Sequence, residues 1–200
     1  MQAFTIVRGP VAALPQPNVD TDVIIRIERL TSVARDALGP YALEALRYRA
    51  DGSEDPAFVL NQPLFREAPI LLTGPNFGCG SSREGAVWAL LARGIRCVIG
   101  ESFGDIFFAN CFQNGVLPVR LPAASVARIG ELTADGSALT VNLTSRQLLF
   151  SDGTALDFDV DPLRREALLE GLDDIGQTLK RTAVIDAWQA RDRLARPWVW

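Results

Sequence analysis

Residues 74–90, GPNFGCGSSREGAVWAL, place two serines, an arginine and a glutamate directly after a glycine-rich stretch. A serine hydroxyl can hydrogen-bond a substrate or transfer a proton, and an arginine forms a planar fork that suits carboxylates. The apolar residues that follow predict a helix, so the serines would lie at its N-terminus, where free N–H groups attract anions. The pattern favours a site that binds a carboxylate, with Ser81 and Ser82 beside Arg83.

Other interpretations of this stretch differ in how well they fit. It lacks the GxxxxGK[ST] pattern of a phosphate loop and a third glycine at the dinucleotide spacing. It also lacks the GxSxG pattern of a nucleophile elbow. A purely structural turn stays open, because glycine permits the turn and serine commonly caps a helix.

The chain contains no histidine, which excludes Ser-His-Asp and Cys-His triads, HExxH zinc sites and any histidine base. The three cysteines, Cys79, Cys97 and Cys111, are too scattered for a zinc or iron–sulfur site held by this chain alone. Chemistry must therefore use Ser, Cys, Asp, Glu, Arg, Tyr or Lys180, or groups from another chain.

Composition limits the partners and the compartment. A net charge of −4 and a pI near 4.9 argue against nucleic acid, although all 20 basic residues except Lys180 are arginines. No secretory pattern and no run long enough to span a bilayer occur, so we expect a cytoplasmic protein. With 200 residues, 48% hydrophobic and 22% charged, the chain has the composition of one globular domain.

The middle of the chain has the clearest organisation. Apolar runs at 69–74, 96–102 and 116–122 predict buried strands, and the segments 82–93 and 103–115 between them predict helices. Strands and helices that alternate in this way imply a parallel sheet with right-handed crossovers. In the second helix we expect Ile106, Phe107, Cys111 and Phe112 in the core, and Asn110 and Asn114 as caps or supporting groups.

The flanking regions differ in pattern. Before the sheet we expect a strand at 3–7, a polar turn at 18–22, a helix over 26–38 ended by Gly39-Pro40, and a short helix at 41–48. After Pro122 we expect a helix and then antiparallel strands over 138–160. Helices follow in a C-terminal extension of about residues 160–200, so the chain is predicted to be a single α/β domain over 1–200 with this extension.

Four motifs together carry a family resemblance: NVDTDVII (18–25), NFGCGSSRE (76–84), SFGDIFFANCFQNGVLPV (102–119) and GLDDIGQTL (171–179). In this order they resemble the small subunits of 3-isopropylmalate dehydratases, the swivel-domain members of the aconitase superfamily. The similarity runs from about Phe4 to Trp188. It implies a swivelling β/β/α domain with a mostly parallel central sheet and a small antiparallel β element.

The resemblance also assigns roles. It implies that Ser81 is the catalytic base and that Ser82 and Arg83 bind a substrate carboxylate. Arg26 or Arg29 would supply a second carboxylate clamp, and the residues do not decide which. The supporting positions are Asp20, Thr21, Asp22, Asn76, Gly78, Gly80 and Glu84.

The implied activity needs a second chain. Such an enzyme is a hydro-lyase of leucine biosynthesis that interconverts 2-isopropylmalate and 3-isopropylmalate by dehydration and rehydration. The resemblance implies that this chain binds no metal or cofactor and that a large subunit carries a 4Fe-4S cluster. The open iron of that cluster would act as Lewis acid while Ser81 removes a proton. The chain would be active only with that large subunit, as a heterodimer or heterotetramer that takes a small di- or tricarboxylate.

Two departures from the family pattern keep alternatives open. The family usually has SSREHA where this chain has SSREGA, with Gly85 in the histidine position, and glycine inside a helix costs about 1 kcal/mol relative to alanine. The family also tends to follow DTDxII with proline and a basic residue, where this chain reads IIRIERL (24–30), and the segment 31–39, where the family discriminates the side group of the substrate, lacks the usual form. The alternatives are a related dehydratase for citramalate, dimethylmalate or homocitrate, or a non-catalytic partner subunit.

Overall fold

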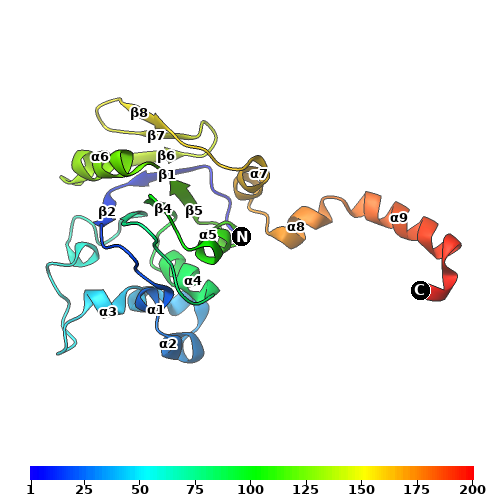
Figure 1. The fold of residues 1–200 in the computed structure, drawn as a ribbon, viewed down its shortest axis with the longest axis horizontal. Coiled ribbons are helices and arrows are strands. Elements are labelled where there is room, and N and C mark those ends of the chain that lie inside the picture. Colours follow the sequence, from blue (N-terminus) through cyan, green and yellow to red (C-terminus); the bar gives the residue numbers. More distant parts are fainter.

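A computed structural model describes all residues, 1–200, and contains two four-stranded sheets (Figure 1). The parallel sheet has the strand order β2-β3-β4-β5, formed by Val11–Leu14, Ile70–Thr73, Cys97–Gly100 and Leu117–Arg120. The antiparallel sheet has the order β1-β6-β7-β8, formed by Ile6–Gly9, Leu139–Asn142, Gln147–Leu149 and Ala155–Asp157. The predicted α/β class, with a parallel sheet and an antiparallel β element, is confirmed.

The crossovers of the parallel sheet are the two predicted helices. Helix α4 (Glu84–Ala92) connects β3 to β4, and α5 (Asp105–Asn114) connects β4 to β5. Every residue of β3 and β4 is buried, as expected for parallel strands that are covered on both faces. The loops that could bind a ligand therefore lie at the carboxyl ends of these strands.

The core is divided into two clusters by the parallel sheet, because successive strand residues point to opposite faces. Leu71 and Val98 belong to a cluster with α4, α5 and the N-terminal helices. Ile70 and Ile99 belong to a second cluster, shared with the antiparallel sheet and α6 (Ala123–Thr133). The parallel sheet is thus the middle layer of the molecule, with helices on one side and the antiparallel sheet on the other (Figure 1).

The N-terminal strand differs from its prediction. Instead of one strand at 3–7, β1 and β2 follow each other on either side of Pro10, and each joins a different sheet. The sequence does not indicate strand β2, because VAAL has no alternating pattern and the strand pairs with β3, which is distant in sequence. The corner is tight at Gly9, where a Cβ atom would lie 2.6 Å from Cδ of Pro69.

The predicted continuous helix over 26–38 is wrong. The segment forms α2 (Ile27–Ser32) and a 3-10 turn, η1 (Arg35–Ala37), separated by the extended residues Val33 and Ala34. Helix α2 buries no residue, and its Ser32 hydroxyl donates to the carbonyl of Glu28. Because α2 has no fully buried residue, it lacks the packing that usually stabilises a longer helix.

Short helical elements surround this segment. Asp20 caps α1 (Thr21–Ile24) by accepting a hydrogen bond from the N–H of Val23, at the predicted polar turn. The predicted short helix at 41–48 is present as α3 (Glu44–Arg47). The 3-10 turns η2 (Gly39–Tyr41) and η3 (Val59–Asn61) flank it.

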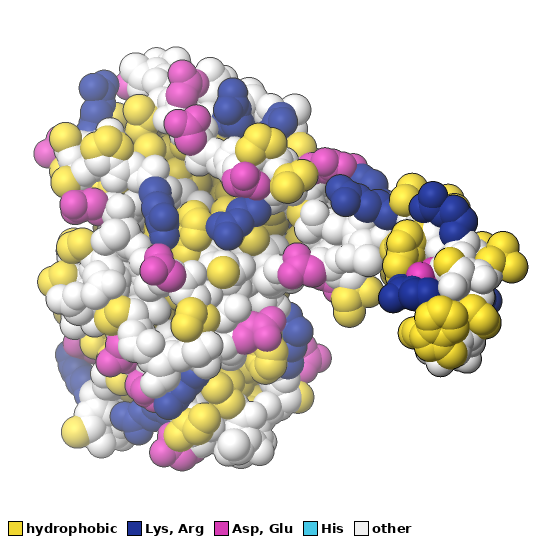
Figure 2. Space-filling view, turned by 45° about the vertical axis from the view of Figure 1, so that its right-hand side comes forward, with side chains coloured by type: hydrophobic (Ala, Val, Ile, Leu, Met, Phe, Trp, Pro, Cys, Tyr) yellow, Lys and Arg dark blue, Asp and Glu magenta, His cyan; other side chains and the backbone are white.

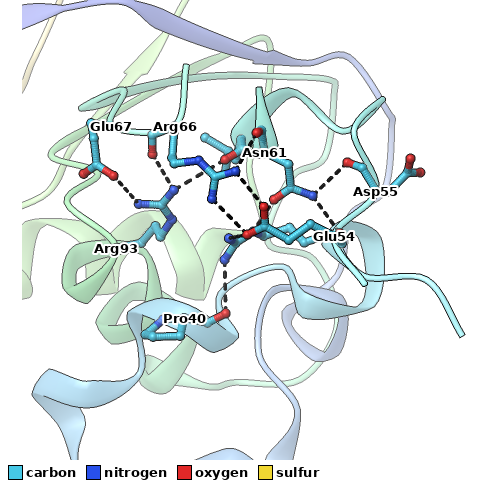
Figure 3. A network of polar contacts seen from close by, with 9 residues as sticks. Pro40, Glu54, Asp55, Asn61, Arg66, Glu67 and Arg93 are labelled. Atoms are coloured by element: carbon cyan, nitrogen blue, oxygen red, sulfur yellow. Dashed lines mark hydrogen bonds and ion pairs between the residues drawn. The ribbon is translucent and has the colours of Figure 1, made fainter. Parts of the chain in front are cut away.

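A polar network fastens the long connection between α3 and β3 (Figure 3). Arg47 is only 4% exposed, donating through Nε to Asn61 and through a terminal nitrogen to the carbonyl of Pro40, both at 3.1 Å. Arg66 forms a two-pronged ion pair with Glu54 at 2.9 and 2.6 Å. The network supplies the partners that a buried arginine requires.

The chain ends in an extended C-terminal arm, defined here as residues 173–200. Helix α7 (Pro162–Glu170) packs on the body through its buried Ala167 and Leu168, whereas α8 (Asp174–Leu179) and α9 (Thr182–Ala195) bury no residue. Figure 1 shows the arm projecting from the body, and Figure 2 shows hydrophobic side chains on its surface. The last element is the 3-10 turn η4 (Pro197–Val199).

No helix is long and apolar enough to cross a membrane. The division into one domain with an extension stays a prediction.

Candidate functional site

Three of the four motifs, at 18–25, 76–84 and 102–119, meet at the carboxyl end of the parallel sheet. The loop 74–83, called the serine loop below, runs from β3 to α4. On one side the N–H of Gly78 donates to the carbonyl of Val19 at 2.7 Å, and the N–H of Thr21 donates to Cys79 at 3.0 Å. On the other side the N–H of Gly104 donates to the carbonyl of Phe77 at 2.9 Å. Backbone pairing therefore brings motifs together that lie far apart in the sequence.

Gly78 explains why this loop needs glycine. Its φ is +72°, in the left-handed region, and a Cβ atom would lie 2.3 Å from the ring of Phe107. Asn76 also has a positive φ, 58°, which asparagine tolerates better than most residues. Its side chain donates to that of Asn18 at 2.8 Å, and its N–H donates to the hydroxyl of Ser102 at 2.8 Å. The loop conformation is thus fixed by local chemistry.

The two serines do not cap helix α4. The N-cap residue is Arg83, and no side chain accepts a hydrogen bond there, so the alternative in which serine serves as the cap is wrong. Both serines are exposed. The carbonyl of Ser81 accepts a hydrogen bond of 3.0 Å from the hydroxyl of the buried Thr21, which holds the backbone of Ser81 beside α1.

Arg83 forms an ion pair with Asp22 of α1. Since about half of the Asp22 side chain is exposed, this pair is of the surface kind, which contributes little to stability. A substrate carboxylate could therefore replace Asp22 on the guanidinium at small cost. The predicted supporting residues Asp20, Thr21 and Asp22 all lie beside the serine loop: Asp20 pairs with Cys79 in a β-bridge.

Glu84 is anchored from helix α5. Its Oε1 accepts a hydrogen bond of 2.8 Å from the side chain of Asn114, which is 4% exposed. The sequence indicated a supporting role or a cap for Asn114, without the link to Glu84. Phe107, Cys111 and Phe112 are buried as expected, whereas Ile106 is 50% exposed, so its assignment to the core is wrong. Ile106 lies in the first turn of α5, on the side of the helix that faces solvent.

Gly85 gives space to a neighbouring side chain. A Cβ atom on this buried residue would lie 2.4 Å from Cδ2 of Leu30. Leu30 belongs to α2, in the segment that departs from the family pattern. The two places where this chain departs from the family pattern are therefore in contact. Glycine at position 85 is explained by the space that the side chain of Leu30 occupies.

The candidate clamps Arg26 and Arg29 both reach Glu44 of α3. Arg29 donates through Nε to both carboxylate oxygens at 3.1 Å, and this hydrogen bond raises its pKa above the ordinary value. Its guanidinium also lies 4.3 Å from the centre of the Tyr41 ring. Arg26 is 59% exposed and lies 3.7 Å from Glu44. Both line a cavity of about 540 Å³ with Tyr48. Neither forms a hydrogen bond or ion pair with the serine loop.

The described residues offer no group of three or more His, Cys, Asp or Glu side chains that could hold a metal ion. Burial raises the pKa of the Cys97 and Cys111 thiols, and Cys79 is partly buried. The three cysteines form no group of ligands, and two of them are buried, so they do not fit a 4Fe-4S cluster, whose thiolate ligands must lie together around the irons.

The site is thus a loop with two serines and an arginine, at the carboxyl end of a parallel sheet that packs against an antiparallel sheet. The sequence that forms it matches a known class of proteins. The family described as "Aconitase C-terminal domain" matches residues 1–124, which include every predicted site residue. Curated relatives extend this match over the whole chain. The small subunit of 3-isopropylmalate dehydratase from Gluconacetobacter diazotrophicus is 50% identical over 200 residues, covering 99% of this chain and 97% of its own. That from Dinoroseobacter shibae is 48% identical over 201 residues, covering both chains fully. The chain therefore belongs to the family of 3-isopropylmalate dehydratase small subunits, as the motifs predicted.

The fold agrees with a solved structure. The crystal structure of 3-isopropylmalate dehydratase from Methanocaldococcus jannaschii aligns with a TM-score of 0.68 at 26% identity. The alignment covers 91% of this chain and 98% of that one. The roles of individual side chains stay predictions.

Proposed function

We propose that this chain is the small subunit of a hydro-lyase that interconverts 2-isopropylmalate and 3-isopropylmalate in leucine biosynthesis. The observation that supports it most directly is the exposed Ser81 beside Arg83 at the start of α4, with no capping role for either serine. The names of relatives about half identical over their whole length support the same substrate.

In this proposal Ser81 takes the proton from the carbon next to a substrate carboxylate. A serine without a histidine partner can act as a base only if its alkoxide is stabilised, and the N–H groups at the start of α4 and the charge of Arg83 can do this. Loss of the hydroxyl from the adjacent carbon then completes the dehydration. Water re-adds with the positions of hydroxyl and hydrogen exchanged.

Carboxylate binding falls to Arg83, Ser82 and one more cation. We assign the second clamp to Arg26, because Arg29 is already hydrogen-bonded by Glu44 and stacked on Tyr41. Arg26 is exposed and makes only the longer contact with Glu44. It is therefore the cation that a substrate could engage without breaking a short ion pair.

The partner in this proposal is a large subunit that carries a 4Fe-4S cluster, which when bound supplies Lewis-acid chemistry at the substrate hydroxyl. This chain's thiols do not fit such a cluster, and the relatives are named as subunits. The complex would be a cytoplasmic heterodimer or heterotetramer, active only when assembled. A related dehydratase acting on citramalate, dimethylmalate or homocitrate is the second candidate, favoured by the contact between Leu30 and Gly85, two positions at which this chain departs from the family pattern.

The test is turnover by the complex assembled with its large subunit without oxygen. Each of the four substrates is assayed, and the highest kcat/KM identifies the substrate. Ser81→Ala should lower kcat by about 10²- to 10⁴-fold, the usual contribution of a general base. Ser151→Ala, in the exposed turn between β7 and β8, is the matched control. Full activity of Ser81→Ala would refute the base assignment, and no turnover of any substrate would favour a non-catalytic subunit.

A further inference from the structure

The side-chain amide of Asn114 uses its full hydrogen-bonding capacity. An amide has two N–H donors and two acceptor lone pairs. The nitrogen of Asn114 donates to Oε1 of Glu84 at 2.8 Å and to the carbonyl of Asn110 at 2.9 Å. Its oxygen accepts from Nε1 of Trp88 at 3.1 Å and from the guanidinium of Arg35. Such a satisfied buried group fixes its neighbours strongly, because each lost bond leaves a buried polar atom without a partner.

The partners of Asn114 come from separate parts of the chain. Glu84 and Trp88 lie on α4, directly after the serine loop, and Arg35 lies in η1. The guanidinium of Arg35 also lies 4.6 Å from the centre of the Trp88 ring, at cation–π distance. Asn114 therefore connects the segment 26–38 to the helix that follows the serines.

A second contact holds the same segment on α4. Leu30 of α2 occupies the space left open by Gly85, in the first turn of α4. Because α2 buries no residue, its position depends on a few side-chain contacts of this kind. Leu30 and Arg35 attach the segment at two points to one helix, and Arg26 lies at the start of that segment.

We propose that Asn114 is a positioning residue for the reaction. It joins Glu84 and Arg35 into one hydrogen-bonded unit and so sets the distance between Arg26 and the Ser81–Arg83 pair. It touches neither substrate nor reacting atoms. The inference rests on the proposed function, in which Arg26 and Arg83 bind the substrate and Ser81 deprotonates it.

The experiment exchanges the donor and the acceptor of the Asn114–Glu84 bond in the assembled complex. Asn114→Asp keeps the acceptors for Arg35 and Trp88 but places two carboxylates together. KM for the best substrate should rise about ten-fold, the effect of losing one hydrogen bond to a charged group, with kcat changed much less. The double variant Asn114→Asp with Glu84→Gln restores the donor–acceptor pair between these two residues, but not the hydrogen bond to the carbonyl of Asn110, and should reverse part of the rise in KM. Hydrogen exchange of residues 26–38 should rise in the single variant and be lower again in the double variant.

The matched control is Gln113→Ala, on the same helix, whose amide contacts Asp174 of the arm instead of the site. It should change neither KM nor exchange in 26–38. The proposal is overturned if Asn114→Asp leaves KM and exchange unchanged, or if the double variant lowers neither of them relative to the single variant. A rescued Asn114→Asp with a fully active Ser81→Ala would refute the base and keep the positioning role. Exchange in the isolated chain tests the link even if the complex turns over no substrate.

Discussion

Arg83 has two potential anionic partners. In the structure its guanidinium pairs with the half-exposed Asp22, and in the proposed reaction a substrate carboxylate takes that place. An exchange of this kind needs a cation that binds both partners with similar geometry, which the planar fork of arginine provides.

We therefore expect Arg83→Lys to raise KM about ten-fold or more, because lysine keeps the charge and loses the two-pronged geometry. The measurement is the KM and kcat of the assembled complex. Arg8→Lys, an exposed arginine on β1, is the control and should leave both constants unchanged. A KM for Arg83→Lys equal to that of the unaltered chain would remove Arg83 from the substrate site.

At the scale of elements, the serine loop depends on backbone conformations that only a few residues adopt. Gly78→Ala adds a left-handed alanine, which costs about 1–2 kcal/mol, and a clash with Phe107, which costs about 1–3 kcal/mol more. Urea unfolding should thus show a loss of about 2–5 kcal/mol. Gly52→Ala is a matched control, since Gly52 has a φ of +82° and no atom within 4 Å of its added Cβ. Equal losses in both variants would contradict the packing contribution.

The connection between α3 and β3 should make stability depend on acid. The hydrogen bond from Arg66 lowers the pKa of Glu54 from its ordinary value of 4.5. A carboxyl group whose pKa is lower in the folded state than in the unfolded state stabilises the fold at pH values above its unfolded-state pKa. This contribution is lost as the pH falls through the folded-state pKa. The urea midpoint of Glu54→Gln should therefore lie below that of the unaltered chain at pH 7, and the two should converge as the pH falls below 4.5 and through the folded-state pKa of Glu54. Glu131→Gln, exposed on α6, is the control. A difference that persists in acid would exclude this ion pair as its source.

The elements that could be predicted from sequence are those whose pattern is local. The buried runs of β3 and β4 and the glycine-ended helix α5 carry their own signals, and the motifs identified the serine loop. Strand β2 could not be predicted, because its pairing partner lies more than fifty residues away. The break at Val33 and Ala34 and the link between Asn114 and Glu84 also depend on tertiary contacts that no window of sequence contains.

At the scale of the whole molecule, the body and the arm differ in how much they bury. Helix α7 contributes Leu168 to the core, whereas no residue of α8 or α9 is buried. We expect a chain that ends at Leu172 to unfold at nearly the same temperature as the full chain, because few buried contacts are removed. A chain that ends at Val160 loses α7 as well and should unfold at a clearly lower temperature. Circular dichroism melting compares the two, and a large loss in the first would mean that the arm stabilises the body.

The arm also determines what tryptophan fluorescence reports. Three of the four tryptophans, Trp188, Trp198 and Trp200, are exposed in the arm, and the fourth, Trp88, lies in the body under the guanidinium of Arg35. The full chain therefore emits mainly from indoles in water. The chain that ends at Leu172 has a single tryptophan, and the quenching and spectral maximum of Trp88 would report in real time whether Arg35 is packed on α4.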